Sequence, residues 1–196
     1  MSRAARLAIV LTFAALPTMV HAHEQIGEAT GFVTGFMHPI TGLDHIIAMV
    51  AVGLWGAQLG APAIWMLPVT FPIVMAFGGF LGIIGVPVPG VEIGIALSGV
   101  LLGAAVMTES RPPLIIAAAL IAVFAIFHGH SHGAELPPGT SGVTYSIGFV
   151  VATGMLHACG IGIGTIHRWS YGRLALRALG GLISVGGVFF LSQAFA

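Results

Sequence analysis

Six apolar stretches follow one another along the chain, each long enough to be tested as a membrane-spanning helix. A helix needs about 20 residues to cross a bilayer, and lipid tails leave only helices or closed barrels able to satisfy the backbone. The stretches lack the alternation of barrel strands. We therefore predict an all-α, polytopic membrane helix bundle with six transmembrane helices. The stretches are Gly31–Gly56, Ala63–Ile84, Val91–Thr108, Pro113–Ala134, Val143–Ile166 and Leu174–Phe195.

The composition argues against a water-soluble domain. Hydrophobic residues make up 57% of the 196 residues and charged residues only 6%, whereas a soluble domain carries about 25% charged residues. The net charge is zero and the chain has no lysine, so nothing indicates a nucleic-acid partner. The single cysteine, Cys159, excludes an internal disulfide and a CxxC metal site. The partner that the composition does predict is the lipid bilayer.

Residues 1–22 have the pattern of a secretory signal peptide. Arg3 and Arg6 form a charged start, and Leu7–Leu16 is a short apolar core. Ala22 then ends a cleavage site of small residues. The alternative is an uncleaved first transmembrane helix, which the short apolar core disfavours.

Cleavage after Ala22 would leave residues 23–196 as a single six-helix transporter domain with its N-terminus outside the cytoplasm. The new terminal residue would be His23, whose amine and imidazole could together hold a metal ion. Both termini of the mature chain would then lie on the outer side. Every basic residue of the mature chain would fall on the cytoplasmic side, as the positive-inside rule expects. These residues are Arg111, Arg168, Arg173 and Arg177.

The first stretch carries the ionisable motif HPITGLDH, which begins at His38. His38 and His45 are seven residues apart, so a continuous helix would place them on one face. Asp44 lies beside His45 in the sequence. Pro39 removes a backbone donor and is predicted to bend or start the helix. Gly42 is predicted to let a neighbouring helix approach closely.

The fourth stretch ends in a second motif, FHGHSHGAE, which begins at Phe127. The helix must continue into this motif, because the apolar residues before it are too few to span a membrane alone. His128 and His132 are then four residues apart on one face. Glu135 is seven residues beyond His128 and close to the same face, whereas His130 points elsewhere.

These side chains favour a metal site. Imidazole and carboxylate together suit divalent first-row metals such as nickel, cobalt and zinc. The alternative is a set of hydrogen bonds that tie the helices together. Five histidines and two acids in two short segments favour the metal site, since ionisable groups inside a membrane are usually functional. The near absence of thiolate disfavours copper(I) or an iron–sulfur cluster.

The pair of motifs, HPxxGxDH and FHGxxHGxE, resembles that of the HupE/UreJ family of nickel permeases, and every fixed position matches. The resemblance covers the whole mature chain. It implies secondary uptake of nickel, sometimes cobalt, by bacteria that make hydrogenase or urease, and hence an indirect link to the maturation of those enzymes. It implies a multi-pass protein of the bacterial inner membrane with no cofactor besides the transported ion. The implied metal contacts are His38, Asp44, His45, His128, His132 and Glu135.

Four residues are weaker candidates for the metal site or its pathway. His130 falls at a variable position of the second motif. His157 lies in the middle of the fifth stretch, either as a packed histidine or as the next stop toward the cytoplasm. Glu92 begins the third stretch, as an interfacial acid or as a partner that orients an imidazole. The fourth is His23.

Other functional classes stay open at this point. No nucleotide-binding loop is present, so transport would be secondary or channel-like. An intramembrane zinc metalloenzyme would use the same ligands, but the chain has no HExxH motif, and we predict a protein that is not an enzyme. A haem cytochrome is disfavoured by Asp44 and Glu135. A metal sensor or accessory subunit remains an alternative function. Assembly into a homo-oligomer is also left open.

Overall fold

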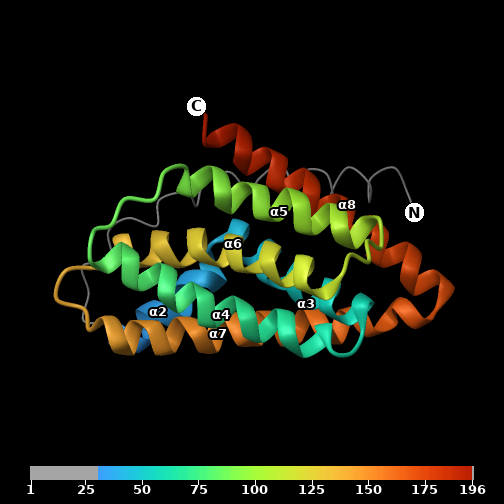
Figure 1. Ribbon diagram of the computed structural model, residues 1–196, viewed down its shortest axis with the longest axis horizontal. Coiled ribbons are helices and arrows are strands. Elements are labelled where there is room, and N and C mark those ends of the chain that lie inside the picture. The colour runs from blue at the N-terminus through green and yellow to red at the C-terminus, as the bar shows by residue number, and fades with distance from the viewer. Residues whose placement is uncertain (1–30, 196) are drawn as a thin grey trace, which may run out of the picture.

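The computed structural model of the protein describes residues 31–195, and within them every regular element is helical. This confirms the all-α prediction. The predicted signal peptide and His23 lie outside the described residues. The helices, shown in Figure 1, are α2 (Gly31–Thr41), α3 (Leu43–Leu59), α4 (Ala63–Ile83), α5 (Val91–Met107), α6 (Leu114–Ala134), α7 (Gly142–Gly164), the short 3-10 helix η1 (Thr165–Arg168) and α8 (Ser170–Gln193).

Four helices among the described residues, α4, α6, α7 and α8, are long and apolar enough to cross a membrane. The pair α2–α3 makes a fifth if it counts as one broken span. Helix α5 is apolar but has only 17 residues. Each of the six predicted stretches therefore forms helix, whereas the number of candidate spans is four or five.

The first stretch is not the single helix that the sequence predicted. Helix α2 ends at Thr41 and α3 begins at Leu43, and the two axes meet at 80°. Pro39 is helical inside α2, and the break falls at Gly42, which is extended with φ −87° and ψ 110°. The argument that His38 and His45 share a face of one helix is therefore wrong, because they belong to two helices.

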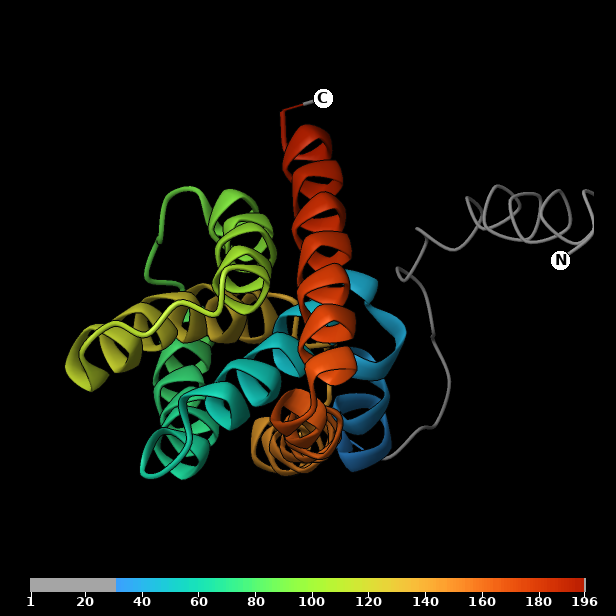
Figure 2. The ribbon, with the colours of Figure 1, turned by 90° about the vertical axis from the view of Figure 1, so that its right-hand side faces the viewer.

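The helices pack in tight groups through glycines. A Cβ atom on Gly129 or Gly133 of α6 would collide with backbone of α4. In the same way Gly103 of α5 faces α8, and Gly160 of α7 faces α3. Small residues of this kind are how membrane helices approach closely. Figure 2 shows α5 and α8 together along one side of the molecule, with the remaining helices below them.

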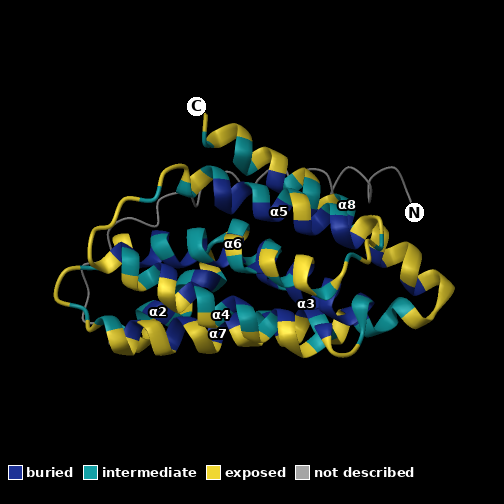
Figure 3. Ribbon diagram, in the orientation of Figure 1, coloured by how far each residue is buried: buried dark blue, intermediate teal, exposed yellow. Residues whose placement is uncertain are grey.

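Large apolar residues are exposed on the outside of the bundle, and Figure 3 marks the exposed residues along the helices. Ile115, Val143 and Leu182, for example, are 76%, 71% and 69% exposed. The buried residues, by contrast, include four histidines. Apolar residues outside and ionisable residues inside is the distribution that a lipid environment favours. The structure thus describes a multi-pass membrane protein whose polar chemistry is kept within the bundle.

Candidate metal centre

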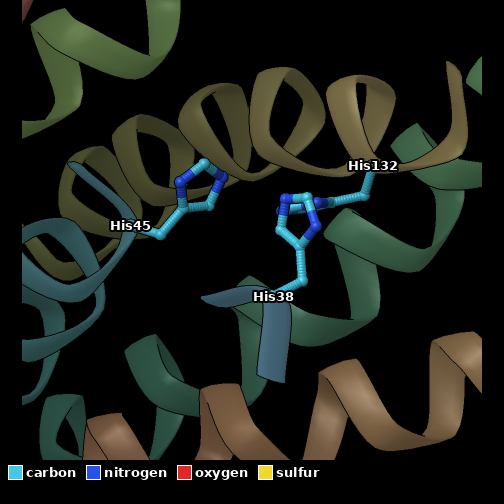
Figure 4. Close-up of side chains that lie close together, drawn as sticks. All are labelled: His38, His45 and His132. Atoms are coloured by element: carbon cyan, nitrogen blue, oxygen red, sulfur yellow. The ribbon is translucent and has the colours of Figure 1, made fainter. Parts of the chain in front are cut away.

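Three imidazoles from three different helices meet within the bundle. His38 comes from α2, His45 from α3 and His132 from α6, and one nitrogen of each lies within 4.8 Å of those of the other two. The ring centroids of His38 and His45 are 4.5 and 4.7 Å from that of His132. Figure 4 shows the three side chains converging from their separate ribbons. The arrangement can hold one metal ion with three nitrogen ligands, and we call these residues the histidine cluster.

The break between α2 and α3 creates this arrangement. Because the axes turn by 80° at Gly42, two residues close in sequence can face the same point from different directions. A Cβ atom on Gly42 would lie 3.0 Å from Oδ1 of Asp44 and 3.1 Å from Nδ1 of His45. Gly42 therefore makes room for the site itself, not for a neighbouring helix as the sequence suggested.

Asp44 orients His45 and is not one of the three residues of the cluster. Its Oδ1 atom lies 2.8 Å from Nδ1 of His45 and accepts a second hydrogen bond from the His45 backbone at 2.9 Å. A carboxylate can only accept, so Nδ1 carries the proton and Nε2 keeps its lone pair. That Nε2 is buried with no hydrogen-bond partner. A carboxylate holding a ligating histidine in this way is a common second layer of metal sites.

His128 lies one turn before His132 on the same face of α6, as predicted, and both are buried. Its Nδ1 lies 3.0 Å from the Phe124 carbonyl, which can only accept, so Nδ1 donates and Nε2 keeps its lone pair. The His128 ring is 5.1 Å from that of His45. Nε2 of His128 and both nitrogens of His132 are buried without a partner. His128 therefore adjoins the histidine cluster as a fourth imidazole.

The other candidates of this region lie around the cluster. Glu135 is exposed at the end of α6 and accepts a hydrogen bond from Ser131 Oγ at 3.0 Å. Glu92, in the first turn of α5, interacts electrostatically with Glu135 and Asp44. His130 points away, as expected, and its Nε2 lies 2.7 Å from the carbonyl of Val86 in the loop after α4.

His157 of α7 does not join the cluster. It is buried, and its Nδ1 lies 3.2 Å from the carbonyl of Pro68 in α4. The ring of Phe71 lies between it and the rest of the site, with its centroid 5.5 Å from His157 and 5.4 Å from His128.

Aromatic side chains that the sequence analysis did not identify form one wall of the site. Phe149 lies 3.9 Å from the His132 ring, and Tyr145 lies 6.3 Å from the His38 ring, measured between centroids. The two are four residues apart on α7, a spacing that indicates a shared face, but aromatic residues at this spacing usually mark ordinary packing. A pocket of about 40 Å³ between α4, α6 and α7 reaches His132 beside this wall, with room for a few water molecules.

The family described as HupE / UreJ protein matches residues 11–190. Protein HupE of Rhizobium leguminosarum bv. viciae is 42% identical over 186 residues, which cover 95% of this chain and 97% of that protein. No solved structure matches.

Proposed function

Because this chain belongs to the HupE/UreJ family, we propose that it is a secondary permease for a divalent transition-metal ion. Nickel is the first candidate and cobalt the second, since imidazole and carboxylate ligands suit both. Members of this family are generally considered transporters rather than enzymes. A transporter needs a binding site within the membrane that its ion can reach and leave.

The observation that carries the proposal is the histidine cluster. Its three ligand nitrogens lie within 4.8 Å of one another, and they come from three helices that are separate in sequence. Two of the residues, His45 and His132, have buried ring nitrogens with no hydrogen-bond partner. Polar atoms inside a membrane protein are normally satisfied. A transported cation would complete them.

The carboxylates act on the charge of the ion. Asp44 fixes the proton of His45 on Nδ1 and so presents Nε2 to the ion. Glu92 lies close enough to Glu135, Asp44 and His45 to interact with them electrostatically, which adds carboxylates near the cluster. Carboxylates close to the ion offset part of the cost of moving its charge out of water. Glu135 would therefore attract the ion toward the site or bind it transiently. It would not be one of the ligands of the bound ion.

The basic residues indicate which end of the bundle faces the cytoplasm. Arg173 and Arg177 of α8 line a pocket with Thr108 and Glu109 at the end of α5, so the segments after the third and fifth stretches meet at one end of the bundle. The positive-inside rule places that end in the cytoplasm. The cluster would then face the periplasm, and both termini of the mature chain would lie outside the bacterial inner membrane. The imported ion would supply hydrogenase or urease maturation.

Uptake of radioactive nickel by cells that express the chain tests the proposal directly. We expect accumulation that His38→Ala abolishes at an unchanged amount of protein in the membrane, and that excess cobalt reduces more than excess zinc. Accumulation that is independent of His38 would contradict the cluster as the transport site. Purified protein that binds nickel without any uptake would instead indicate a sensor or accessory subunit. Metal-dependent hydrolysis of a lipid would indicate an enzyme.

A further inference from the structure

One face of α7 carries a row of buried side chains that leads away from the histidine cluster. Tyr145, Phe149, Thr153 and His157 are each four residues apart, so they form a ridge that winds slowly around the helix. All four are at most 3% exposed. Tyr145 adjoins His38 and Phe149 adjoins His132, whereas His157 lies two helical turns further along.

Three of these four side chains bear a buried polar atom with no hydrogen-bond partner. They are the Tyr145 hydroxyl, Oγ1 of Thr153 and Nε2 of His157. Packing alone would favour apolar residues here, because unsatisfied polar atoms inside a membrane protein are costly and rare. Three in register on one helix face therefore need a functional reason.

The tautomer of His157, and so the position of its lone pair, is fixed by a backbone carbonyl of α4 that has no partner within its own helix. In a regular helix the carbonyl of Pro68 would accept the N–H of residue 72, but Pro72 has none. The freed carbonyl lies 3.2 Å from Nδ1 of His157. Because a carbonyl can only accept, Nδ1 carries the proton and the unpartnered Nε2 keeps its lone pair. Asp44 does the same for His45, and the Phe124 carbonyl does it for His128.

His157 lies further along the bundle than the histidine cluster, toward the basic end of the molecule. The ring of Phe71 contacts both His128 and His157, with centroid distances of 5.4 and 5.5 Å. Helix α7 continues beyond His157 to η1, which carries Arg168. His157 thus lies between the histidine cluster and the basic end of the molecule.

We propose that His157, with the hydroxyl of Thr153 one turn away, forms a second binding station for the same divalent ion, on the far side of Phe71 from the cluster. The station rests on the proposed transport function. One imidazole and one hydroxyl bind a borderline metal more weakly than three imidazoles do. A weak inner station suits an ion in transit, because conduction requires binding that the ion can leave.

Uptake and binding are affected differently if the station is real. In His157→Gln the amide can still donate to the Pro68 carbonyl but offers no imidazole lone pair. We expect nickel uptake to fall by about tenfold or more, the size typical of removing a group that supports a metal site. Equilibrium binding of nickel to the purified protein should stay within about twofold, because the histidine cluster is intact.

A cysteine reporter tests whether an ion reaches this point. In a Cys159→Ala background, where the exposed native thiol is removed, His157→Cys would place a thiolate at the station. Adding Co²⁺ to the purified protein should then produce the intense near-ultraviolet charge-transfer absorption of a cobalt–thiolate bond. Ala158→Cys is the matched control, since its side chain is exposed on the outside of the helix at the same depth. It should give no such band.

The outcomes separate this inference from the proposed function. Wild-type protein that neither binds nor transports nickel would overturn both. Normal cluster binding and His38-dependent uptake, together with normal uptake by His157→Gln and no thiolate band in His157→Cys, would overturn the second station alone. A thiolate band in His157→Cys but not in Ala158→Cys, with reduced uptake by His157→Gln, would support it.

Discussion

Helices α5 and α8 pack against each other closely, as the histidine-bearing helices do, but the polar side-chain atoms of the two regions differ. Those between α5 and α8 have hydrogen-bond partners, whereas many of those on the histidine-bearing helices have none. Between α5 and α8 the backbones meet at glycines such as Gly103 and Gly187. The hydroxyls there are satisfied: the buried Ser98 Oγ donates to the Ile95 carbonyl at 2.6 Å, and the half-buried Ser184 Oγ donates across to the Val100 carbonyl at 2.8 Å. Neither helix contains a histidine.

The helices around the cluster pack just as closely. Gly129 of α6 abuts α4, and Gly160 of α7 abuts α3. Yet within the described residues these helices hold every buried side-chain atom that lacks a hydrogen-bond partner, among them ring nitrogens of His45, His132 and His157. Tight packing is therefore common to both regions, and buried imidazole nitrogens without a hydrogen-bond partner are what distinguish the functional one. The α5–α8 pair acts as a scaffold. Glu92, in the first turn of α5, is the exception, because it is a candidate residue of the metal site.

The largest effect should come from breaking the scaffold. In Gly103→Val the new Cβ would lie 2.5 Å from the backbone nitrogen of Ser184 and 2.7 Å from the carbonyl of Gly180. Overpacking of this kind costs about 3 kcal/mol, a large part of the stability of a typical protein. We expect little folded protein in the membrane and a proportionate loss of uptake, measured by immunoblot and thermal denaturation.

The control is Gly162→Ala on α7, whose added Cβ would meet nothing within 4 Å. It should accumulate and transport normally. Full accumulation of Gly103→Val would show that α5 and α8 are free to separate, and would remove the distinction between scaffold and site.

Breaking the cluster should abolish uptake without affecting the fold. His132→Ala removes the imidazole that contacts both His38 and His45. We expect nickel uptake to fall by about 100-fold or more, with the amount and thermal stability of the protein unchanged. His167→Ala is the matched control, because that histidine lies in η1 and bonds only locally to the Gly164 carbonyl. Equal losses in both variants would contradict the assignment.

Asp44→Asn should have the next largest effect. The amide cannot hold the proton of His45 on Nδ1 with the strength of a charged acceptor, so Nε2 becomes a poorer ligand. We expect nickel affinity and uptake to fall by about 10–100-fold, measured by titration of the purified protein and in cells. Glu109→Gln removes an acid at the opposite end of the bundle and should leave both unchanged.

Acid should weaken nickel binding by competition. An imidazole binds metal only when neutral, so protons displace the ion as the pH falls. Lowering the pH until the ligating imidazoles take up protons should reduce the affinity of the purified protein for nickel. Returning the sample to the starting pH should restore binding, which separates competition from denaturation. Affinity that stays constant down to the lowest pH at which the protein remains folded would argue against imidazole ligands.

The sequence predicted the helical segments and the second motif well, because both depend on local spacing. Apolar runs define helices in lipid regardless of their neighbours, and residues four apart share a helix face in any context, as His128 and His132 do. The first motif was harder. Pro39 indicated a bend, but the 80° break falls at Gly42, where only the side chains of Asp44 and His45 explain why a glycine is needed.

The contact between the HPITGLDH and FHGHSHGAE motifs could not be predicted from the spacing of residues along the sequence. That His38 faces His132 depends on how α2 and α6 are placed by other helices, and the wall formed by Phe149 carries no polar signal in the sequence. Glu135 shows the same limit in reverse, because its spacing from His128 predicted a shared face, whereas it lies exposed beyond the last turn of α6.

The smallest effects give the sharpest comparison, between a hydroxyl that has a hydrogen-bond partner and one that has none. Ser184→Ala removes a satisfied hydrogen bond between α5 and α8 and should cost about 0.6 kcal/mol of stability, an average value for such bonds in membranes, with no change in uptake. Thr153→Val removes a hydroxyl that has no partner, so stability should stay the same or rise.

Uptake by Thr153→Val should nevertheless fall about two- to threefold, because the station beside His157 loses its oxygen donor. Thermal denaturation and nickel uptake of the two variants, measured side by side, would therefore change in opposite combinations. If Thr153→Val instead lost stability and kept its uptake, as expected of Ser184→Ala, the unpartnered atoms on α7 would be features of packing. Unsatisfied polar atoms would then no longer distinguish the transport region from its scaffold.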